Sequence, residues 1–320
     1  MAWAGFDYVT ADSLGRRLYV ARSGPAGHLA VFNLDTLVGN GDIPNVSGHG
    51  ATVNMKYGHG FITSKPVVMF DSKTLAVIKT LDVKGNPDGY LDDPFNDHVY
   101  ILSHTEPNVT VIDAKDGAIL GTIDLGGAPE QAASDGRGGL YIDIEDKNSI
   151  AVVDATTMSM TGKFDISNHG GGCAGLALDV KNEVLFASCR DKNNMIVLSA
   201  KDGRVLADLP IGKGPDGTIF NATTNEAFSS QGDGTLTVIK EKLAYELCCG
   251  ADCENAPSLQ DANARYQNRE DFSYHGRVWR DGTPSRGPTL WTRSDNPGLV
   301  LDCHGRQVIL DCFLFFLVGY

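Results

Sequence analysis

The sequence repeats itself at intervals of about forty residues. An aromatic residue inside a short apolar run recurs at Tyr19, Phe61, Tyr100, Tyr141, Phe186 and Phe228. By subtraction, the successive steps are 42, 39, 41, 45 and 42 residues. A period of this length indicates a repeat fold, in which each copy is one supersecondary unit that buries its apolar face against its neighbours.

Each copy has the pattern of β-strands. Apolar side chains alternate by two, whereas a helical repeat would space them by three and four. The stretch Asn108–Ile142 shows one copy in full, with β-branched runs on both sides of the turn Asp116-Gly117. An Asp-Gly pair between two such runs is a strong hairpin signal. A run that ends in a polar residue also recurs, at Val31–Asp35, Val67–Asp71, Val109–Asp113, Ile150–Asp154, Met195–Ser199 and Leu236–Lys240.

About four strands in each forty-residue copy are typical of the blades of a β-propeller, which measure roughly 40–45 residues. The sequence therefore predicts an all-β fold with six recognisable four-stranded blades in residues 1–242. The first two blades are expected at about 5–45 and 46–84, and the other four begin near Gly85, Gly126, Gly170 and Gly212.

Several segments resemble one known family. The segments Phe6–Asp12, Arg17–Val20, Gly85–Asp88, Val109–Asp113 and Ser229–Val238 look like the bacterial YVTN-repeat, YncE-like β-propellers. The resemblance covers about residues 5–241. It implies a seven-bladed propeller of the periplasm or the cell exterior, and most such proteins have no assigned reaction.

The repeat stops after Lys242. All 14 lysines lie at or before this residue, whereas five of the seven cysteines lie after it. Residues 243–320 are therefore predicted to be an atypical, poorly ordered tail in place of the seventh blade, a linker or second domain being the alternatives. A further hypothesis is a frame shift. Residues 260–271 accept codons that, read one base later, encode a strand followed by the turn Asp-Thr-Lys-Thr-Gly.

The N-terminus does not support export by itself. Residues 1–5 have neither the basic region nor the apolar stretch of a signal peptide. The chain also opens directly on what should be an innermost strand, and an N-terminal truncation is one explanation.

Charge and hydropathy narrow the class of partner. The net charge of −13 opposes association with polyanions, and Arg16, Arg17, Arg22 and Lys56 are too scattered to form a basic stripe. Nucleic acid is therefore not an expected partner. No apolar run approaches the roughly 18–20 residues of a membrane helix, so membrane insertion is not expected either.

One polar residue precedes or begins the innermost strand of most copies. These residues are Asp7, His49, Asp88, Glu130 and Asp216. Since innermost strands all start on the same face of the disc, the five side chains should converge at the mouth of the central channel. Crowded carboxylates bind a cation, keep a proton or spread apart in water. Two interpretations stay open: a site for a divalent metal (Ca²⁺ or Mn²⁺, on Asp7, Asp88, Glu130 and Asp216) or for a cationic ligand, or simple hydrogen bonding around a wet channel.

Loops on the same face supply a second group of polar residues. They are His104, Glu106, Glu145, Asp146, Arg190, Asp191 and Asp233. Their mixed charges suit recognition of a polar ligand, and simple solvation is the alternative.

Cys173 and Cys189 fall at paired ends of two antiparallel strands in the fifth copy. This placement predicts a disulfide or simple proximity. A metal site with His169 is conceivable, but two cysteines lack the four-ligand spacing of structural zinc. A disulfide would also fit an oxidising compartment.

Motifs for common catalytic machinery are absent from the sequence. It contains no G-x-S-x-G elbow, phosphate loop or H-E-x-x-H pair. The favoured function is therefore a non-catalytic propeller that binds a small ligand or a protein through its channel-mouth face. The alternative is a metal-dependent, lactonase-like hydrolase in which the acidic ring holds the cation. Neither the ligand nor the oligomeric state is indicated.

Overall fold

A computed structural model describes residues 6–241, 278–280 and 283–284 of the 320-residue chain. The first three blades contain β1 (Phe6–Asp12), β2 (Arg17–Arg22), β3 (His28–Asn33), β4 (Gly39–Pro44), β5 (Gly48–Asn54), β6 (His59–Ser64), β7 (Val67–Asp71), β8 (Val77–Leu81), β9 (Pro87–Asp93), β10 (His98–Ser103), β11 (Val109–Asp113) and β12 (Ile119–Ile123). The next three contain β13 (Pro129–Ser134), β14 (Gly139–Ile144), the short 3₁₀ helix η1 (Glu145–Lys147), β15 (Ser149–Asp154), β16 (Ser159–Asp165), β17 (Cys173–Asp179), β18 (Val184–Cys189), β19 (Asn194–Ser199), β20 (Val205–Pro210), β21 (Pro215–Asn221), β22 (Glu226–Gln231) and β23 (Thr235–Lys240).

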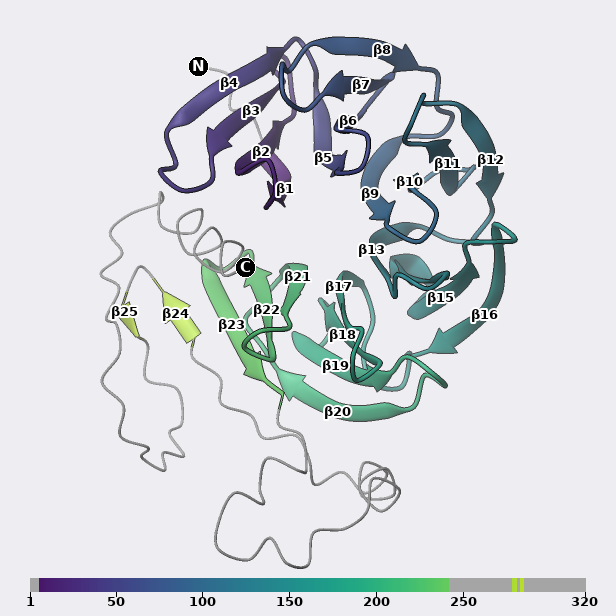
Figure 1. Cartoon of the computed structure of the whole chain (residues 1–320). Coiled ribbons are helices and arrows are strands. Elements are labelled where there is room, and N and C mark those ends of the chain that lie inside the picture. The colour runs from purple at the N-terminus through teal and green to yellow at the C-terminus, as the bar shows by residue number, and fades with distance from the viewer. Residues whose placement is uncertain (1–5, 242–277, 281–282, 285–320) are drawn as a thin grey trace, which may run out of the picture.

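The strands form six antiparallel blades around one axis, with the first strand of each blade nearest that axis (Figure 1). Within a blade the strands pair in sequence order, and each innermost strand packs against the innermost strand of the next blade, from β1 to β21. The predicted fold class is confirmed: an all-β propeller with six blades.

The sixth blade takes its fourth strand from far along the chain. After β21, β22 and β23, the strand β24 (Val278–Arg280) pairs antiparallel with β23, and β25 (Thr283–Pro284) pairs with β24. These two short strands are the described parts of the region after residue 242. The predicted seventh blade, its frame-shift origin and the remaining five cysteines lie outside the described residues.

The polar residue that ends the third strand of a blade forms the turn to the fourth strand. The Oδ1 atom of Asp71 accepts the backbone N–H groups of Lys73 and Thr74 at 3.0 and 2.7 Å. Asp113, Asp154 and Ser199 accept equivalent bonds in blades three to five. In blade one the strand ends at Asn33 rather than at Asp35, and Asn33 makes this contact. The repeated polar residue is therefore a turn former, because its side chain replaces a backbone acceptor.

Glycine completes two of these turns. Gly117 and Gly203 have φ values of 70° and 71°, in the left-handed region that residues with a Cβ atom rarely adopt. They connect β11 to β12 and β19 to β20. The predicted Asp-Gly turns are confirmed at both places.

The hydrophobic core lies between the blades. Each of five clusters joins two consecutive blades, from one and two to five and six. The recurring aromatic of the second strand is part of this core, since Phe61, Tyr100 and Phe186 are 0 % exposed. Burial of such a side chain contributes roughly 1.5–3 kcal/mol. The forty-residue period is therefore the period of the contacts that hold neighbouring blades together.

Hydrogen bonds also cross between blades. The Tyr19 hydroxyl donates to the Ser72 carbonyl at 3.3 Å, and the Tyr141 hydroxyl donates to the Ala200 carbonyl at 3.0 Å. In both cases a second-strand tyrosine reaches a turn of the next blade, which fixes the rotation between the two blades.

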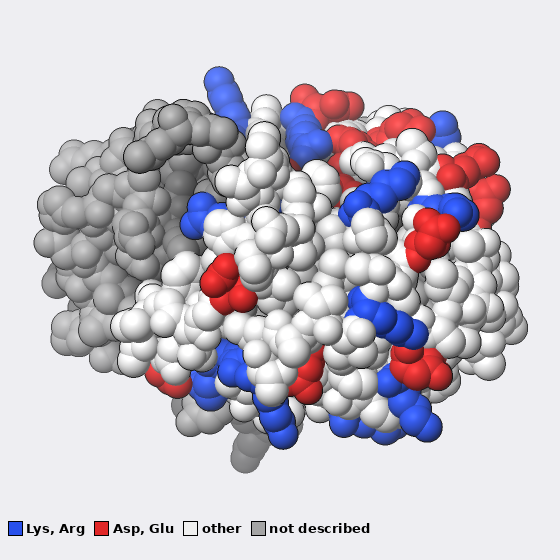
Figure 2. Space-filling model, turned by 90° about the horizontal axis from the view of Figure 1, so that it is seen from above, with Lys and Arg blue, Asp and Glu red and all other residues white. Residues whose placement is uncertain are grey.

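The described surface mixes both signs of charge. In Figure 2, Lys and Arg side chains lie among Asp and Glu side chains rather than in one continuous band. Surface pairs include Lys201 with Glu183 at 2.7 Å and Lys84 with Asp82 at 2.7 Å. Among the described residues, no helix has the length and apolar character needed to cross a membrane.

Candidate functional site

The five residues predicted at the channel mouth share one register position. Each is the second residue of an innermost strand, and the list is Asp7 in β1, His49 in β5, Asp88 in β9, Glu130 in β13 and Asp216 in β21. All five line one cavity of about 450 Å³. In β17 the same position holds Ala174, so blade five adds no polar side chain to this ring. The structure thus brings together the whole predicted set.

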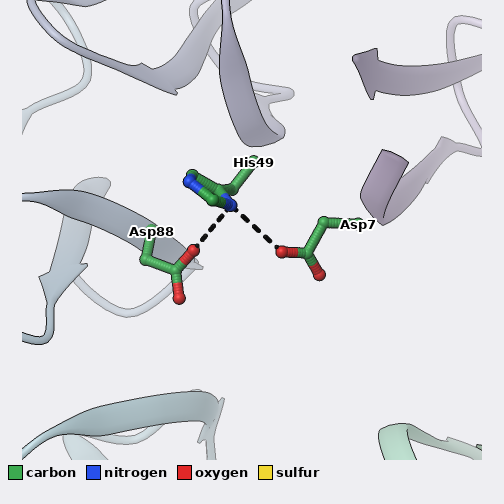
Figure 3. Close-up of side chains that lie close together, drawn as sticks. All are labelled: Asp7, His49 and Asp88. Carbon is green, nitrogen blue, oxygen red and sulfur yellow. Dashed lines mark hydrogen bonds and ion pairs between the residues drawn. The ribbon is translucent and has the colours of Figure 1, made fainter. Parts of the chain in front are cut away.

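His49 lies between two carboxylates from the neighbouring blades (Figure 3). Its Nδ1 atom is 3.1 Å from Oδ2 of Asp7 and 3.0 Å from Oδ1 of Asp88. These two hydrogen bonds, that of Asp7 first, raise the pKa of His49 to about 10 against the opposing effect of desolvation. The ring is therefore a cation at neutral pH when nothing else occupies the site.

His104 repeats this arrangement one blade further on. It directly follows β10, and its Nε2 atom is 3.2 Å from Oδ2 of Asp88 and 3.3 Å from Oε1 of Glu130. The hydrogen bond with Glu130 raises the pKa of His104 as well. Asp88 consequently faces one imidazole with each of its oxygens. Carboxylate and imidazole alternate along five side chains, which we call the channel-mouth ladder: Asp7, His49, Asp88, His104 and Glu130.

Two of the three carboxylates of the ladder are nearly buried. Asp88 and Glu130 are each 8 % exposed. Burial raises the pKa of Glu130, and the hydrogen bond from His104 opposes this rise. Close, desolvated carboxylates are costly unless positive charge lies between them. In the ladder the groups that can supply this charge are the imidazole rings of His49 and His104, whose pKa values are both raised.

Asp216 belongs to a separate group on the same rim. Arg190 donates from Nη2 to Oδ1 of Asp216 at 2.7 Å and from Nη1 to Oε1 of Glu145, and its Nε donates to the Pro215 carbonyl at 3.2 Å. The guanidinium therefore bridges blades four, five and six. It forms ion pairs with two carboxylates that the ladder does not reach.

Two tyrosines lie near the ladder. The rings of Tyr8 and Tyr90 meet edge to face, with centroids 5.5 Å apart, and the Tyr90 hydroxyl is hydrogen-bonded to Thr10. Burial, and then the charges of Glu130, Asp88 and Asp7, raise the pKa of Tyr8 well above its usual value. Both hydroxyls are therefore protonated at neutral pH, and neither ring is among the described residues that line the cavity.

The second predicted group divides in the structure. His104 and Arg190 line the cavity, and Glu145 joins it through Arg190. Glu106, Asp146, Asp191 and Asp233 are not among the described residues that line it. Two of these cap loops instead: Asp146 accepts the N–H of Ala128 at 2.7 Å, and Asp233 accepts the N–H of Lys213 at 3.0 Å.

Ser23 and Asn86 line the cavity and were missed by the sequence reasoning. Ser23 directly follows β2, just as His104, Glu145 and Arg190 directly follow β10, β14 and β18. The register of the second strand was therefore the signal that could have found Ser23. Asn86 lies immediately before β9, two residues from Asp88. It was overlooked because the search for site residues followed charged side chains.

Cys173 and Cys189 are joined by a disulfide. They face each other across the paired strands β17 and β18. Nδ1 of His169 lies 3.8 Å from Oδ2 of Asp208, and neither metal-ligand group found among the described residues contains His169 or the two cysteines. Because both thiols are consumed in the bond, this pair holds the start of blade five in place and offers no thiolate for a metal.

The ladder contains two groups that have the spacing of metal ligands. They are Asp7, His49 and Asp88, and then Asp88, His104 and Glu130; within each group the ligand atoms lie within 4.8 Å of one another. Among the described residues these are the two such groups. Asp216, one of the residues predicted as metal ligands, belongs to neither. Imidazole together with carboxylate suits Mn²⁺, Fe²⁺ or Zn²⁺, whereas Ca²⁺ and Mg²⁺ prefer oxygen ligands alone.

Comparison with known proteins supports the fold and goes no further. No family model matches the sequence, and no curated protein matches it. Among solved structures, a chain of "Crystal Structure of Mitotic Checkpoint Complex" is 13 % identical, with a TM-score of 0.63 over 73 % of this chain and 73 % of that one. A chain of Kuenenia stuttgartiensis hydrazine synthase is 12 % identical, with a TM-score of 0.63 over 74 % of this chain and 83 % of that one. At such identities the likeness concerns the fold alone.

Proposed function

We propose that this propeller is a non-catalytic binding protein that takes a small cationic ligand at the channel-mouth ladder. The supporting observation is the excess of carboxylates. Asp7, Asp88, Glu130 and Asp216 bring four carboxylates to the cavity and Arg190 brings one positive charge, so the sum is −1 when both histidines are protonated and −3 when both are neutral. A cation that replaces the two imidazolium protons would restore this balance.

The cavity wall also bears on the ligand's size and polarity. Every residue that lines the cavity is polar or charged, and the volume of about 450 Å³ suits a small molecule or a hydrated ion. Sites for apolar ligands are lined mainly by hydrophobic and aromatic side chains. A divalent metal ion or a small polar cation is therefore favoured over an apolar ligand or an extended polymer.

The proposal includes family and location. The motifs that resemble YVTN-repeat, YncE-like bacterial propellers support membership in that family, and the Cys173–Cys189 disulfide supports an oxidising compartment such as the periplasm. In such a compartment this site would meet metal ions and small solutes rather than nucleic acid.

Calorimetric titration of the full chain tests the proposal. The chelator-treated protein would be titrated with Mn²⁺, Zn²⁺, Ca²⁺ and putrescine in turn. Saturable binding of at least one of them is expected, and Asp88→Asn should abolish or greatly weaken it. Absence of saturable binding for all four probes would overturn the proposed function.

A second candidate is a metal-dependent, lactonase-like hydrolase. The mixed imidazole and carboxylate donors of the ladder favour it, since a metal ion held by such donors can polarise a carbonyl and activate water. Hydrolysis of a simple γ-lactone by the Mn²⁺-loaded chain, lost in Asp88→Asn, would support this activity. Metal binding without hydrolysis would leave the binding function as stated.

A further inference from the structure

We infer that the channel-mouth ladder holds a pair of divalent transition-metal ions bridged by the carboxylate of Asp88. The inference rests on the proposed function and specifies its ligand. Its starting point is the symmetry of the ladder about one residue. Oδ1 of Asp88 lies 3.0 Å from the ligating nitrogen of His49, and Oδ2 lies 3.2 Å from that of His104.

Each half of the ladder is a complete three-residue donor set. Asp7 completes the first half at 3.1 Å from His49, and Glu130 completes the second half at 3.3 Å from His104. Donor atoms about 3 Å apart can surround an ion at about 2 Å, the usual distance from a transition metal to imidazole nitrogen or carboxylate oxygen. Each half can therefore receive an ion with little movement of its side chains.

The two halves are joined in a way that suits a bridged pair. A carboxylate that points one oxygen at each of two sites is the bridge that holds metal ions roughly 3.5–4 Å apart in two-metal centres. The five side chains come from β1, β5, β9 and β13 and from the residue after β10, so four consecutive blades fix the two halves relative to each other. An ion with three protein ligands also keeps open positions that face the cavity.

A further buried carboxyl group lies near the second half. Asp143 in β14 is 0 % exposed, and neither of its side-chain oxygens has a hydrogen-bond partner. Besides burial, the charges of Glu130 and Glu145 raise its pKa. Asp143 is thus a third carboxyl group near Glu130 and Glu145. Among the described residues, Glu130 pairs with His104 and Glu145 pairs with Arg190. An ion between His104 and Glu130 would offset the charge of Glu130, which contributes after burial to the raised pKa of Asp143.

The donor set selects the metal. Two imidazole nitrogens and three carboxylates favour Mn²⁺, Fe²⁺ or Zn²⁺ over Ca²⁺ and Mg²⁺. Mn²⁺ is the useful probe, because two Mn²⁺ ions that share a bridging carboxylate are magnetically coupled. The coupled signal in electron paramagnetic resonance differs from that of isolated ions.

The experiment combines stoichiometry with this signal. The chelator-treated full chain is titrated with Mn²⁺ while bound and free metal are measured by equilibrium dialysis and by resonance spectra. Two Mn²⁺ per chain with a coupled signal are expected. Asp7→Asn and Glu130→Gln should each retain one uncoupled ion. Asp88→Asn should lose the coupling and weaken binding by at least roughly tenfold. Removal of a residue that only hydrogen-bonds to a metal ligand already costs about tenfold to a hundredfold in affinity, and Asp88 would be a ligand itself.

The control is Glu106→Gln, which alters a carboxylate in the loop after His104 without touching the cavity wall; it should bind two coupled ions like the wild type. Circular dichroism of each variant verifies that the blades are folded. One uncoupled Mn²⁺ per chain in the wild type would overturn the pair and leave the proposed function standing. A coupled signal that persists in Asp88→Asn would overturn the bridging role. If the chain binds none of the four probes (Mn²⁺, Zn²⁺, Ca²⁺ and putrescine), both proposals are overturned.

Discussion

The Nδ1 atom of His49 lies 3.0 Å from the Oδ1 atom of Asp88, and the contact joins the innermost strands of blades two and three. These strands also pack against each other along their length. The polar contact is therefore placed by the same blade packing that forms the core. Its strength can be measured apart from any ligand.

A double-mutant cycle measures this pair. In the presence of a chelator at neutral pH, where the raised pKa of His49 keeps its ring protonated, His49→Gln and Asp88→Asn should show a coupling energy of about 0.5–1 kcal/mol in urea unfolding. The modest size reflects the exposure of the His49 side chain, which is 42 %. A control cycle on Asp7 and His104, which belong to different halves of the ladder, should give a value near zero. Equal couplings in the two cycles would contradict a direct ion pair.

Replacement of Arg190 should strengthen cation binding. Arg190→Gln leaves Glu145 and Asp216 without their shared guanidinium, so the potential at the cavity becomes more negative. At an effective dielectric typical of a protein surface, the change is worth about 1 kcal/mol, or roughly fivefold in affinity for a divalent ion. Calorimetry at low salt measures it, and the gain should shrink as salt is added. Weaker binding in the variant would mean that Arg190 contacts the ligand itself.

Asp92 gives the protein a pH-dependent stability. Burial raises the pKa of Asp92 to about 6, although Asn54 donates to its Oδ1 at 2.9 Å. The unfolded chain releases this proton near pH 4, so the folded state binds more protons between about pH 4 and 6. Stability contributed by the protonated form is complete below this window and is lost as pH rises through it.

Asp92→Asn should remove this loss. The amide keeps an oxygen for Asn54 and never ionises, so the variant should exceed the wild type by roughly 1–2 kcal/mol at neutral pH, a value reduced for partial solvent exposure. The two proteins should have nearly equal stability below about pH 4. Urea unfolding at a series of pH values checks the prediction. A stability difference that does not depend on pH would rule out titration of Asp92 as the cause.

The disulfide of blade five should contribute measurably to stability. Cys173 and Cys189 are separated by 16 residues, and closing a loop of this length stabilises a protein by about 3 kcal/mol in the chain-entropy model. The double variant Cys173→Ala, Cys189→Ala should lose about 2–3 kcal/mol in urea unfolding. Added reductant should destabilise the wild type by a similar amount and leave the double variant unchanged. A reductant effect of equal size in both proteins would assign it to other cysteines.

Much of this architecture could be read from the sequence, because the repeated residues have repeated physical tasks. Phe61 and Tyr100 recur since every blade must bury an aromatic against its neighbour, and Asp71 and Asp113 recur since every outer hairpin needs a turn former. The ring of polar residues followed from register in the same way.

Partners within the site could not be read in this way. The pairing of Asp216 with Arg190, and of Asp88 with two imidazoles at once, depends on side-chain directions at loops of different blades. The strand Val278–Arg280 was equally hidden, because three residues carry no detectable alternation and the region around them does not repeat. Sequence spacing locates elements, whereas contacts between blades decide what their ends touch.

Ala174 occupies the one innermost-strand position of the six blades where the rim has no polar side chain. The ladder therefore lies along one arc of the opening, from blade one to blade four, instead of encircling it. A ligand bound to the ladder would lie to one side of the pore, in contact with protein on that side and open to solvent on the other. The side of the mouth that the ladder leaves uncovered belongs to blades five and six, where Arg190 and Asp216 would face a second molecule that approaches the bound ligand.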